Sequence, residues 1–244
     1  MTAICSFLRL ALFGLGGLAV EANAGEMTEV DLQLILAADT SVSMNPDELR
    51  MQRDGYVAAF RHRDLTDAIL SGPLGRVAVT YVEWAGPADQ AVVVPWTILA
   101  DRKGISDFAN RLAAAATERR GISTALSSGL RFAAQRFGES GVQSNRKAID
   151  VSGDGIGNDG PPLDWARALV VGDGITVNGL SVVLPETDIY GPFAAMFGSD
   201  DADVHAYYRD QVIGGPGAFA IAVNDMNDFA AAIRRKLVME IAWR

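Results

Sequence analysis

The sequence predicts an α/β domain with a doubly wound, mostly parallel six-stranded sheet, one antiparallel edge strand, and helices on both faces. Short apolar segments alternate along the chain with segments whose apolar residues recur at helical spacing, which is typical of strand–helix–strand units in a parallel sheet. One pair of strand segments is joined only by Gly86-Pro87-Ala88-Asp89. Because a parallel crossover needs a much longer connection, that pair is expected to be an antiparallel hairpin.

The first strand and its helix have the clearest signals. Val30 to Ala38 is almost continuously apolar, as expected for a strand covered on both faces. Asn45 can cap the next helix, Pro46 suits its first turn, and Glu48 stands three residues after the cap, as in a capping box. The apolar residues that give this helix a buried stripe are Leu49, Tyr56, Val57 and Phe60.

The remaining elements follow from the same two patterns. Further strands are expected at 76–84, 90–99, 147–152, 175–184 and 218–223. Further helices are expected at 105–116, 125–137, 161–171, 204–212 and 225–242. Pro95 indicates an edge position for the second strand of the hairpin, because proline has no backbone N–H for a central ladder. Trp84, Trp96 and Trp165 are expected in the core.

Residues 1–24 are predicted to be a secretory signal peptide. Arg9 precedes an apolar run over 10–20, and Ala22-Asn23-Ala24 offers the small residues that a signal peptidase accepts. The run is about half of the roughly 20 residues that a membrane span needs. The alternative is a buried N-terminal helix. Cleavage after Ala24 leaves residues 25–244 as a single domain, periplasmic or secreted, with no membrane span.

Composition argues against several classes of function. The only cysteine is Cys5, inside the predicted signal, so the rest of the chain has no disulfide, thiol nucleophile or thiolate metal site. Two histidines far apart in sequence, His62 and His205, argue against an imidazole-rich zinc or iron site. The formal net charge of −9 argues against nucleic acid, because phosphate binding needs a basic surface.

Three polar segments are expected at the carboxyl ends of the strands, where parallel sheets bind ligands. Asp39-Thr40-Ser41-Val42-Ser43 follows the first strand, and alternate side chains point the same way if the segment is locally extended. Gly153-Asp154-Gly155 follows another strand, and Gly121-Ile122-Ser123-Thr124 precedes a helix. Oxygen donors with few carboxylates suit a hard cation such as Mg²⁺, Mn²⁺ or Ca²⁺.

These segments resemble the metal-ion-dependent adhesion site of von Willebrand factor type A (VWA) domains, which have Asp-x-Ser-x-Ser, a threonine in a glycine-containing loop, and Asp-Gly after the fourth strand. The resemblance covers roughly residues 29–243, and Tyr81–Gly86 and Ile149–Gly155 are similar to a bacterial branch of unknown function. It implies a VWA/Rossmann-like fold and a cation surrounded by Asp39, Ser41, Ser43, Thr124 and Asp154. The middle loop has one residue more than the family's Gly-x-Thr, so Ser123 stays an alternative to Thr124.

The function that the resemblance implies is a binding module and not an enzyme. It would hold Mg²⁺, or Mn²⁺ or Ca²⁺, and grip a carboxylate on a partner protein. The alternative is a metal-dependent, phosphatase-like hydrolase that uses the same oxygens. A third possibility is a scaffold that keeps the fold and binds no cation.

Gly155-Ile156-Gly157-Asn158-Asp159-Gly160 has the spacing of a dinucleotide-binding loop, but its context argues against a nucleotide. The strand before it is not the first of the fold. Asp154 and Asp159 would repel a pyrophosphate, and Pro161-Pro162 removes amide donors from the start of the helix.

Overall fold

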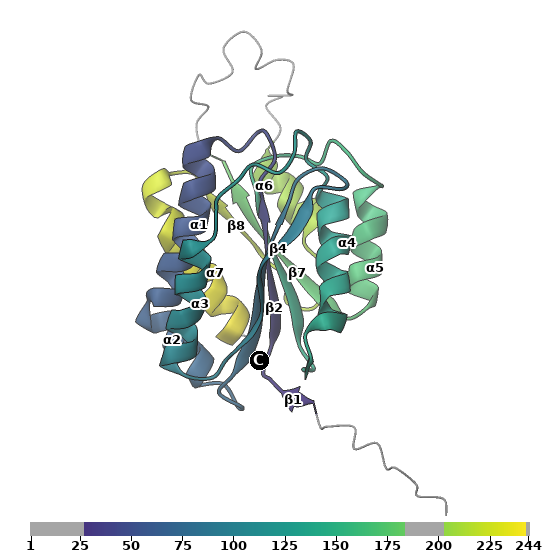
Figure 1. The fold of residues 1–244 in the computed structure, drawn as a ribbon. Coiled ribbons are helices and arrows are strands. Elements are labelled where there is room, and N and C mark those ends of the chain that lie inside the picture. The colour runs from purple at the N-terminus through teal and green to yellow at the C-terminus, as the bar shows by residue number, and fades with distance from the viewer. Residues whose placement is uncertain (1–26, 184–202, 243–244) are drawn as a thin grey trace, which may run out of the picture.

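A central six-stranded sheet organises the molecule, in the order β4-β3-β2-β6-β7-β8 (Figure 1). The computed structural model describes residues 27–183 and 203–242, so the predicted signal peptide lies outside the described residues. The strands are β2 (Gln33–Asp39), β3 (Val77–Trp84), β4 (Gln90–Leu99), β6 (Lys147–Gly153), β7 (Ile175–Val182) and β8 (Ala220–Val223). Only β3 and β4 pair in antiparallel fashion. The predicted fold class is therefore confirmed, with β4 as the antiparallel edge strand.

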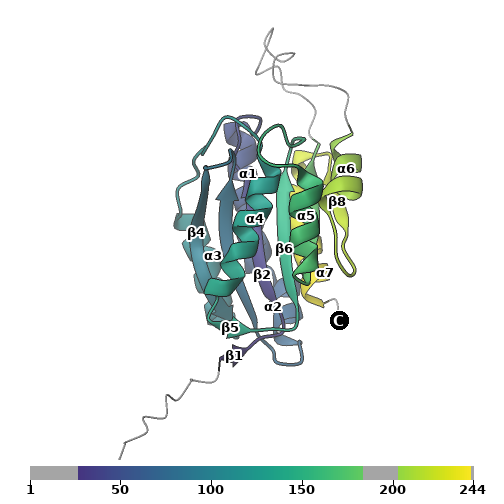
Figure 2. The same ribbon diagram turned by 90° about the vertical axis from the view of Figure 1, so that its right-hand side faces the viewer.

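Helices cover both faces of the sheet (Figures 1 and 2). One layer contains α1 (Pro46–Arg61), α2 (Arg63–Leu70), α3 (Arg102–Ala114) and α7 (Phe229–Ala242). The other contains α4 (Leu126–Arg136), α5 (Leu163–Gly172) and the short α6 (Val204–Tyr207). Alternate residues of β2 enter the two cores: Leu34 and Leu36 face the first layer, and Ile35 and Ala37 face the second. The apolar run of the first strand thus reflects burial on both sides.

The start of α1 is fixed by the predicted capping box. Oδ1 of Asn45 accepts from the backbone N–H groups of Asp47 (2.8 Å) and Glu48 (3.0 Å), and Glu48 Oε2 accepts from the N–H of Asn45 (2.8 Å). Such a cap contributes about 1 kcal/mol. It also fixes where the chain leaves the segment after β2, which limits the freedom of residues 40–44.

Charged side chains lie buried where β6 faces α7. Lys236 Nζ is 2.6 Å from Asp150 Oδ1 and 2.6 Å from Glu240 Oε1, and all three side chains are almost completely inaccessible. Burial and the Asp150 carboxylate raise the pKa of Glu240 to about 8. Buried charges of this kind need their partners, so the triad fixes the position of α7 on the sheet.

Three features of this fold differ from or add to the sequence-based expectations. Helix α2 was not predicted, because its eight residues give too short a periodic pattern. It begins at Arg63 and is capped by His62, whose Nδ1 accepts from the N–H of Asp64 (3.2 Å). Strands β1 (Thr28–Glu29) and β5 (Val142–Gln143) form a separate two-stranded parallel sheet. The expectation that Trp165 is in the core was wrong: its side chain is 45% exposed, and the Arg131 guanidinium lies 4.8 Å from its ring centroid.

The helix expected over 204–212 is in fact two pieces. After α6 the chain continues as a π-helical turn, Tyr208–Val212, in which the N–H of Ile213 donates to the carbonyl of Tyr208 at 3.0 Å. A π-turn holds one residue more than an α-turn, so it changes the direction in which side chains point. Tyr207, at the end of α6, and Tyr208, at the start of the π-turn, are both buried.

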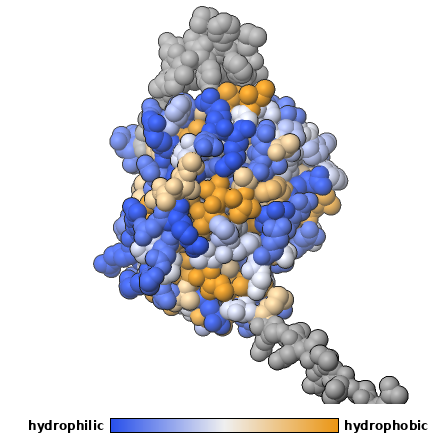
Figure 3. Space-filling model, in the orientation of Figure 1, coloured by the Kyte–Doolittle hydropathy of each residue, from blue (hydrophilic) through white to orange (hydrophobic). Residues whose placement is uncertain are grey.

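The exposed edge of the sheet carries apolar side chains. Figure 3 shows them in the middle of this face, where β4 runs between the two helical layers in Figure 1. Val92 and Ile98 of β4 are both more than a third exposed, while Pro95 interrupts the row of donors that an edge strand offers. In the part of the chain that the structure describes, no helix has the length and apolar character that a membrane crossing requires.

Candidate metal centre

Three loops meet at the carboxyl edge of the sheet. Asp39 is the last residue of β2, the middle strand of the neighbouring trio β3-β2-β6. The loop after β2 runs to the cap of α1, the loop before α4 carries Thr124, and the loop after β6 carries Asp154. Because β2 and β6 run parallel, the loops after them meet at the upper end of the sheet in Figure 1. The loop before α4 follows α3 and joins them beside the end of β3, where the N–H of Ala125 donates to the carbonyl of Ala85 (2.8 Å).

All five predicted ligands lie in one hydrogen-bonded cluster. Thr124 Oγ1 donates to Ser41 Oγ (3.2 Å), and the hydroxyl oxygens of Ser41 and Ser43 are 2.9 Å apart. Ser43 Oγ donates to Asp154 Oδ1 at 2.7 Å. The N–H of Ser41 donates to Asp39 Oδ1, also at 2.7 Å. Three hydroxyl groups and two carboxylates from distant parts of the sequence therefore converge.

The serines converge through a turn and not through an extended segment. Residues 41–44 form a bend and turn, so the expectation of local extension was wrong although its consequence holds. Thr40 fixes the start of the turn, because its N–H and hydroxyl both donate to the carbonyl of Trp84, at 2.8 and 3.2 Å. From α1, Gln52 Nε2 donates to the carbonyl of Asp39 at 2.9 Å. Backbone and helix contacts thus hold the turn in place.

Ser123 and Thr124 have different partners. Thr124 is buried with its hydroxyl on Ser41, whereas Ser123 Oγ donates to Asp159 Oδ2 at 2.9 Å, near the surface. Two hydrogen bonds tie this loop to the next: the N–H of Thr124 donates to the side-chain Oδ1 of Asn158 (2.9 Å), and the N–H of Asn158 donates to the carbonyl of Thr124 (3.0 Å). Of the two alternatives, Thr124 is the one whose hydroxyl lies in the cluster.

Buried ion pairs support the other side of the turn. Glu83, at the end of β3, contacts both Arg53 and Arg120, with 2.6 Å between Arg120 Nε and Glu83 Oε2. The N–H of Arg120 donates to the carbonyl of Thr40 (3.2 Å), and Arg119 Nη2 donates to the carbonyl of Met44 (2.9 Å). The loop before α4 is thereby attached to the loop that carries the serines.

The electrostatics of the cluster favour a positive partner. Asp39 is completely buried, and burial, followed by the nearby Asp154 charge, raises the pKa of Asp39 well above its usual value. Burial also raises the pKa of Asp154 to about 6, although the hydroxyl of Ser43 opposes the shift. Among the described residues, Asp39 Oδ2 is buried and has no hydrogen-bond partner. Two adjacent carboxylates with an unsatisfied oxygen are costly to bury without a compensating charge.

The donor set fits a hard divalent cation. Such ions take carboxylate, hydroxyl and water oxygens. Within the described ranges, no group of three or more His, Cys, Asp or Glu side chains is placed to hold a metal ion. Gly155 lies beside the cluster, because a Cβ there would be in ordinary contact, at 3.8 Å, with both Ser43 Oγ and Thr124 Oγ1.

Tyr208 and Gly153 belong to the surroundings of the site; the sequence placed Gly153 in one of the three polar segments, and it did not indicate Tyr208. A Cβ on Gly153 would lie 2.6 Å from the Tyr208 hydroxyl and 2.8 Å from Asp39 Oδ2. Burial, and then the charges of Asp39 and Asp154, raises the pKa of Tyr208 well above its usual value. No local pattern links a tyrosine in the second half of the chain to the end of the first strand, so only the fold brings them together.

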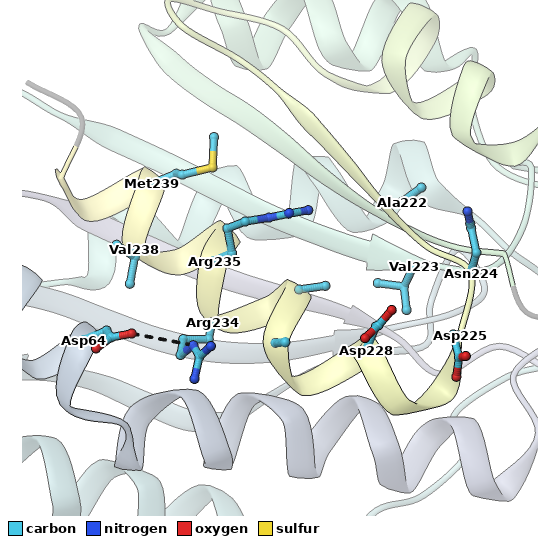
Figure 4. Close-up of a pocket in the computed structure, with 12 residues that line it drawn as sticks. Asp64, Ala222, Val223, Asn224, Asp225, Asp228, Arg234, Arg235, Val238 and Met239 are labelled. Atoms are coloured by element: carbon cyan, nitrogen blue, oxygen red, sulfur yellow. Dashed lines mark ion pairs between the residues drawn. The ribbon is translucent and has the colours of Figure 1, made fainter.

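A separate open cleft of about 750 Å³ lies between α7 and β8 (Figure 4). Arg234 and Asp64 form an ion pair (3.9 Å) at this cleft, and Arg235, Asp225 and Asp228 also line it. None of the predicted ligands is among its lining residues. The volume of this cleft therefore does not mark the candidate site. The oxygen donors at the strand ends identify it.

The fold is that of a VWA-type domain. Similar solved structures include proximal thread matrix protein 1 from the mussel byssus, described with a zinc-occupied MIDAS motif (14% identity, TM-score 0.58, covering 89% of this chain and 49% of that one). They also include the pilus adhesin SpaC from Lactobacillus rhamnosus GG (14% identity, TM-score 0.59, 89% and 31%). The hypothetical protein BatB from Bacteroides thetaiotaomicron matches over its whole length (20% identity, TM-score 0.55, 87% and 100%).

The chain belongs to the family described as protein of unknown function DUF1194, whose model matches residues 29–244. It spans about half of the mussel protein and about a third of the adhesin. No curated protein matches it in sequence.

Proposed function

We propose that this protein is an exported binding module that holds a divalent cation at Asp39, Ser41, Ser43, Thr124 and Asp154 and uses it to bind an acidic group on a partner protein. The observation that carries the proposal is the continuous hydroxyl chain from Thr124 to Asp154 beside the buried, unpartnered Oδ2 of Asp39. A polar cluster of this kind is costly unless a cation compensates the two carboxylates.

A bound cation would supply a Lewis-acidic site that accepts an external carboxylate. The chain offers neutral hydroxyls at three of the five positions, and its two carboxylates together balance the charge of a divalent cation. Mg²⁺ typically keeps several waters when it binds to few protein oxygens, and such positions are open to exchange. An acidic side chain of a partner can replace one of these waters, because a carboxylate oxygen is a preferred ligand of such ions.

The choice of Mg²⁺, with Mn²⁺ or Ca²⁺ as alternatives, rests on the oxygen-only donors. The zinc in the mussel protein supports a divalent ion in a site of this type and leaves open which ion this chain prefers. Zn²⁺ usually takes histidine and cysteine ligands, which the five residues do not include.

The proposal of a binding module, and not an enzyme, is supported by what the structural neighbours are named: a matrix protein and an adhesin. The two histidines also have other partners. His62 caps α2, and Nδ1 of His205 lies 3.0 Å from Ser181 Oγ. The rival remains a phosphatase-like hydrolase that uses the same oxygens.

Export to the periplasm or beyond the cell follows from the predicted signal peptide at residues 1–24. Mass spectrometry of the protein purified from the envelope and culture fractions tests this part. A mature chain that begins at Gly25 supports it, and a chain that retains residues 1–24 contradicts it.

Isothermal titration with Mg²⁺, Mn²⁺ and Ca²⁺ tests the cation site. We expect the wild type to bind at least one of them and Asp39→Ala to lose binding, because the buried carboxylate faces the cluster. Ser123→Ala is the matched control, since it removes a hydroxyl from the same loop outside the cluster, and it should bind as the wild type does. Absence of binding by the wild type would refute the cation site.

A screen of phosphate and ester substrates separates the binding module from its rival. We expect no turnover that depends on the site. Turnover by the wild type that disappears in Asp39→Ala would favour the hydrolase.

A further inference from the structure

Tyr208 brings an unpartnered hydroxyl group to the floor of the candidate cation site. It begins the π-turn after α6, and its side chain is fully buried. Within the described residues, neither its hydroxyl oxygen nor Oδ2 of Asp39 has a hydrogen-bond partner. Both oxygens approach the same point of the backbone, since a Cβ on Gly153 would lie within 3 Å of each, at 2.6 and 2.8 Å. Two orphaned buried oxygens therefore face one another across a glycine.

The surrounding backbone makes room for this tyrosine ring. Gly179 of β7 provides the other wall, because a Cβ there would lie 2.8 Å from Cδ1 of Tyr208. On the neighbouring residue, the hydroxyl of Tyr207 accepts from the N–H of Gly157 at 3.2 Å. The two tyrosines thus contact both ends of the loop that carries Asp154. Figures 1 and 2 show α6, which leads into them, beside the strand ends.

Packing alone does not account for the hydroxyl group. A buried hydroxyl without a partner costs about 1–3 kcal/mol, and phenylalanine would fill the same slot between the two glycines without that cost. A phenol is protonated at neutral pH, because its ordinary pKa is about 10, so the hydroxyl can donate. Oδ2 of Asp39, the oxygen of that carboxylate without a donor, approaches the same point beside Gly153 as the hydroxyl does.

We propose that Tyr208 is a positioning residue of the cation site: its hydroxyl donates to a bridging water that donates in turn to Oδ2 of Asp39, and it thereby orients this carboxylate toward the cation. The inference rests on the proposed cation site and adds a residue from the far end of the chain to it. One water satisfies both oxygens, which make no direct hydrogen bond with each other. Outer-shell partners of this kind fix the orientation of the groups that face a metal.

Titration of Tyr208→Phe with Mg²⁺ tests the role of the hydroxyl. Affinity should fall by about 10–100-fold, the usual cost of losing an outer-shell partner, whereas the matched control Tyr207→Phe should stay within about threefold of the wild type. Melting of both variants in EDTA checks the fold. Tyr208→Phe should melt close to the wild-type temperature, because phenylalanine fills the same slot between Gly153 and Gly179.

The near-UV difference spectrum on Mg²⁺ addition gives a readout that a purely structural role would not change. Wild type and Tyr207→Phe should show a tyrosine difference band, and Tyr208→Phe should lack it. Wild-type affinity together with an unchanged band in Tyr208→Phe overturns the role of Tyr208; if Asp39→Ala still abolishes binding, the cation site itself stands. Absence of Mg²⁺, Mn²⁺ and Ca²⁺ binding by the wild type overturns both proposals.

Discussion

Neighbouring residues of the chain contribute very differently to the cluster at the strand ends. Thr124 is buried against Ser41, and Ser123 reaches Asp159 near the surface. The conformation of the loop determines which of the two hydroxyl groups lies in the cluster. Substitution of single residues therefore tests which side chains belong to the cation site.

Replacing Thr124 with valine should weaken cation binding by at least about tenfold, because losses in the outer shell alone cost 10–100-fold. Valine has the same shape and lacks only the hydroxyl, so the fold should be retained. Titration calorimetry measures the change, with Ser123→Ala as the control. Equal loss in both variants would contradict the assignment of Thr124.

The pH dependence of stability without a cation should depend on Asp154. Its folded-state pKa is raised to about 6, above the value of about 3.9 for an aspartate in an unfolded chain. As the pH falls from 7 through 6, the folded state takes up a proton that the unfolded state does not, so stability should rise until the pH approaches 4. Asp39, whose pKa is also raised, adds to this trend in the same direction.

Asp154→Asn should remove part of this pH dependence, on the order of 1–2 kcal/mol between pH 7 and pH 4. Urea unfolding in EDTA at several pH values measures it for both proteins. Glu240, with a pKa raised to about 8, contributes a similar trend in both, so the difference isolates Asp154. A wild type that loses stability more steeply than the variant as the pH falls from 7 to 5 contradicts the sign.

The N-terminal cap of helix α1 fixes the segment that follows strand β2 and carries the serines of the site. The capping box of Asn45 and Glu48 ends the turn that holds Ser41 and Ser43. Gln52, on the first turns of the same helix, bonds the carbonyl of Asp39. The element thus fixes the turn from two directions.

Asn45→Ala should lower the free energy of unfolding by about 0.5–2 kcal/mol, the usual cost of losing such a cap. Asn45→Asp keeps an acceptor for the same two N–H groups and should stay near the wild type. Urea denaturation measures both. Similar losses in the two variants would show that the cap acts by some other means.

The helices and strands differ in how well the sequence predicts them. Strands β2 and β6 and helix α1 were predictable because long apolar patterns and a capping box mark them. Helix α2 and the π-turn at Tyr208 were not, because eight residues give little periodicity and a π-turn follows from tertiary packing. Trp165 was misplaced because α5 buries only a narrow stripe at Ala166 and Val170.

For the candidate site, the sequence predicted that these five side chains lie close together, and it did not predict the geometry of the cluster. Resemblance to the adhesion site of VWA domains indicated the five oxygen donors, and parallel strands bring their loops together. The turn at Ser41 to Ser43 and the contribution of Tyr208 depend on contacts between segments far apart in the chain, which leave no local signal.

For the whole molecule, a cation that binds only the folded state should raise its stability. At a free concentration of 100 times Kd the gain is about 2.7 kcal/mol. For a domain of 150–250 residues, each kcal/mol raises Tm by about 2–4 °C. Thermal melts in excess Mg²⁺ should therefore lie several degrees above melts in EDTA, and Asp39→Ala should show no difference. Equal melting of the wild type in both conditions would favour a scaffold without a cation.

A crystal structure of the protein with Mn²⁺, with anomalous scattering data collected near the manganese edge, tests the cation site most directly. The account predicts an anomalous peak among the hydroxyls of Ser41, Ser43 and Thr124, beside the carboxylates of Asp39 and Asp154. A peak only elsewhere, or no peak at saturating Mn²⁺, would contradict it.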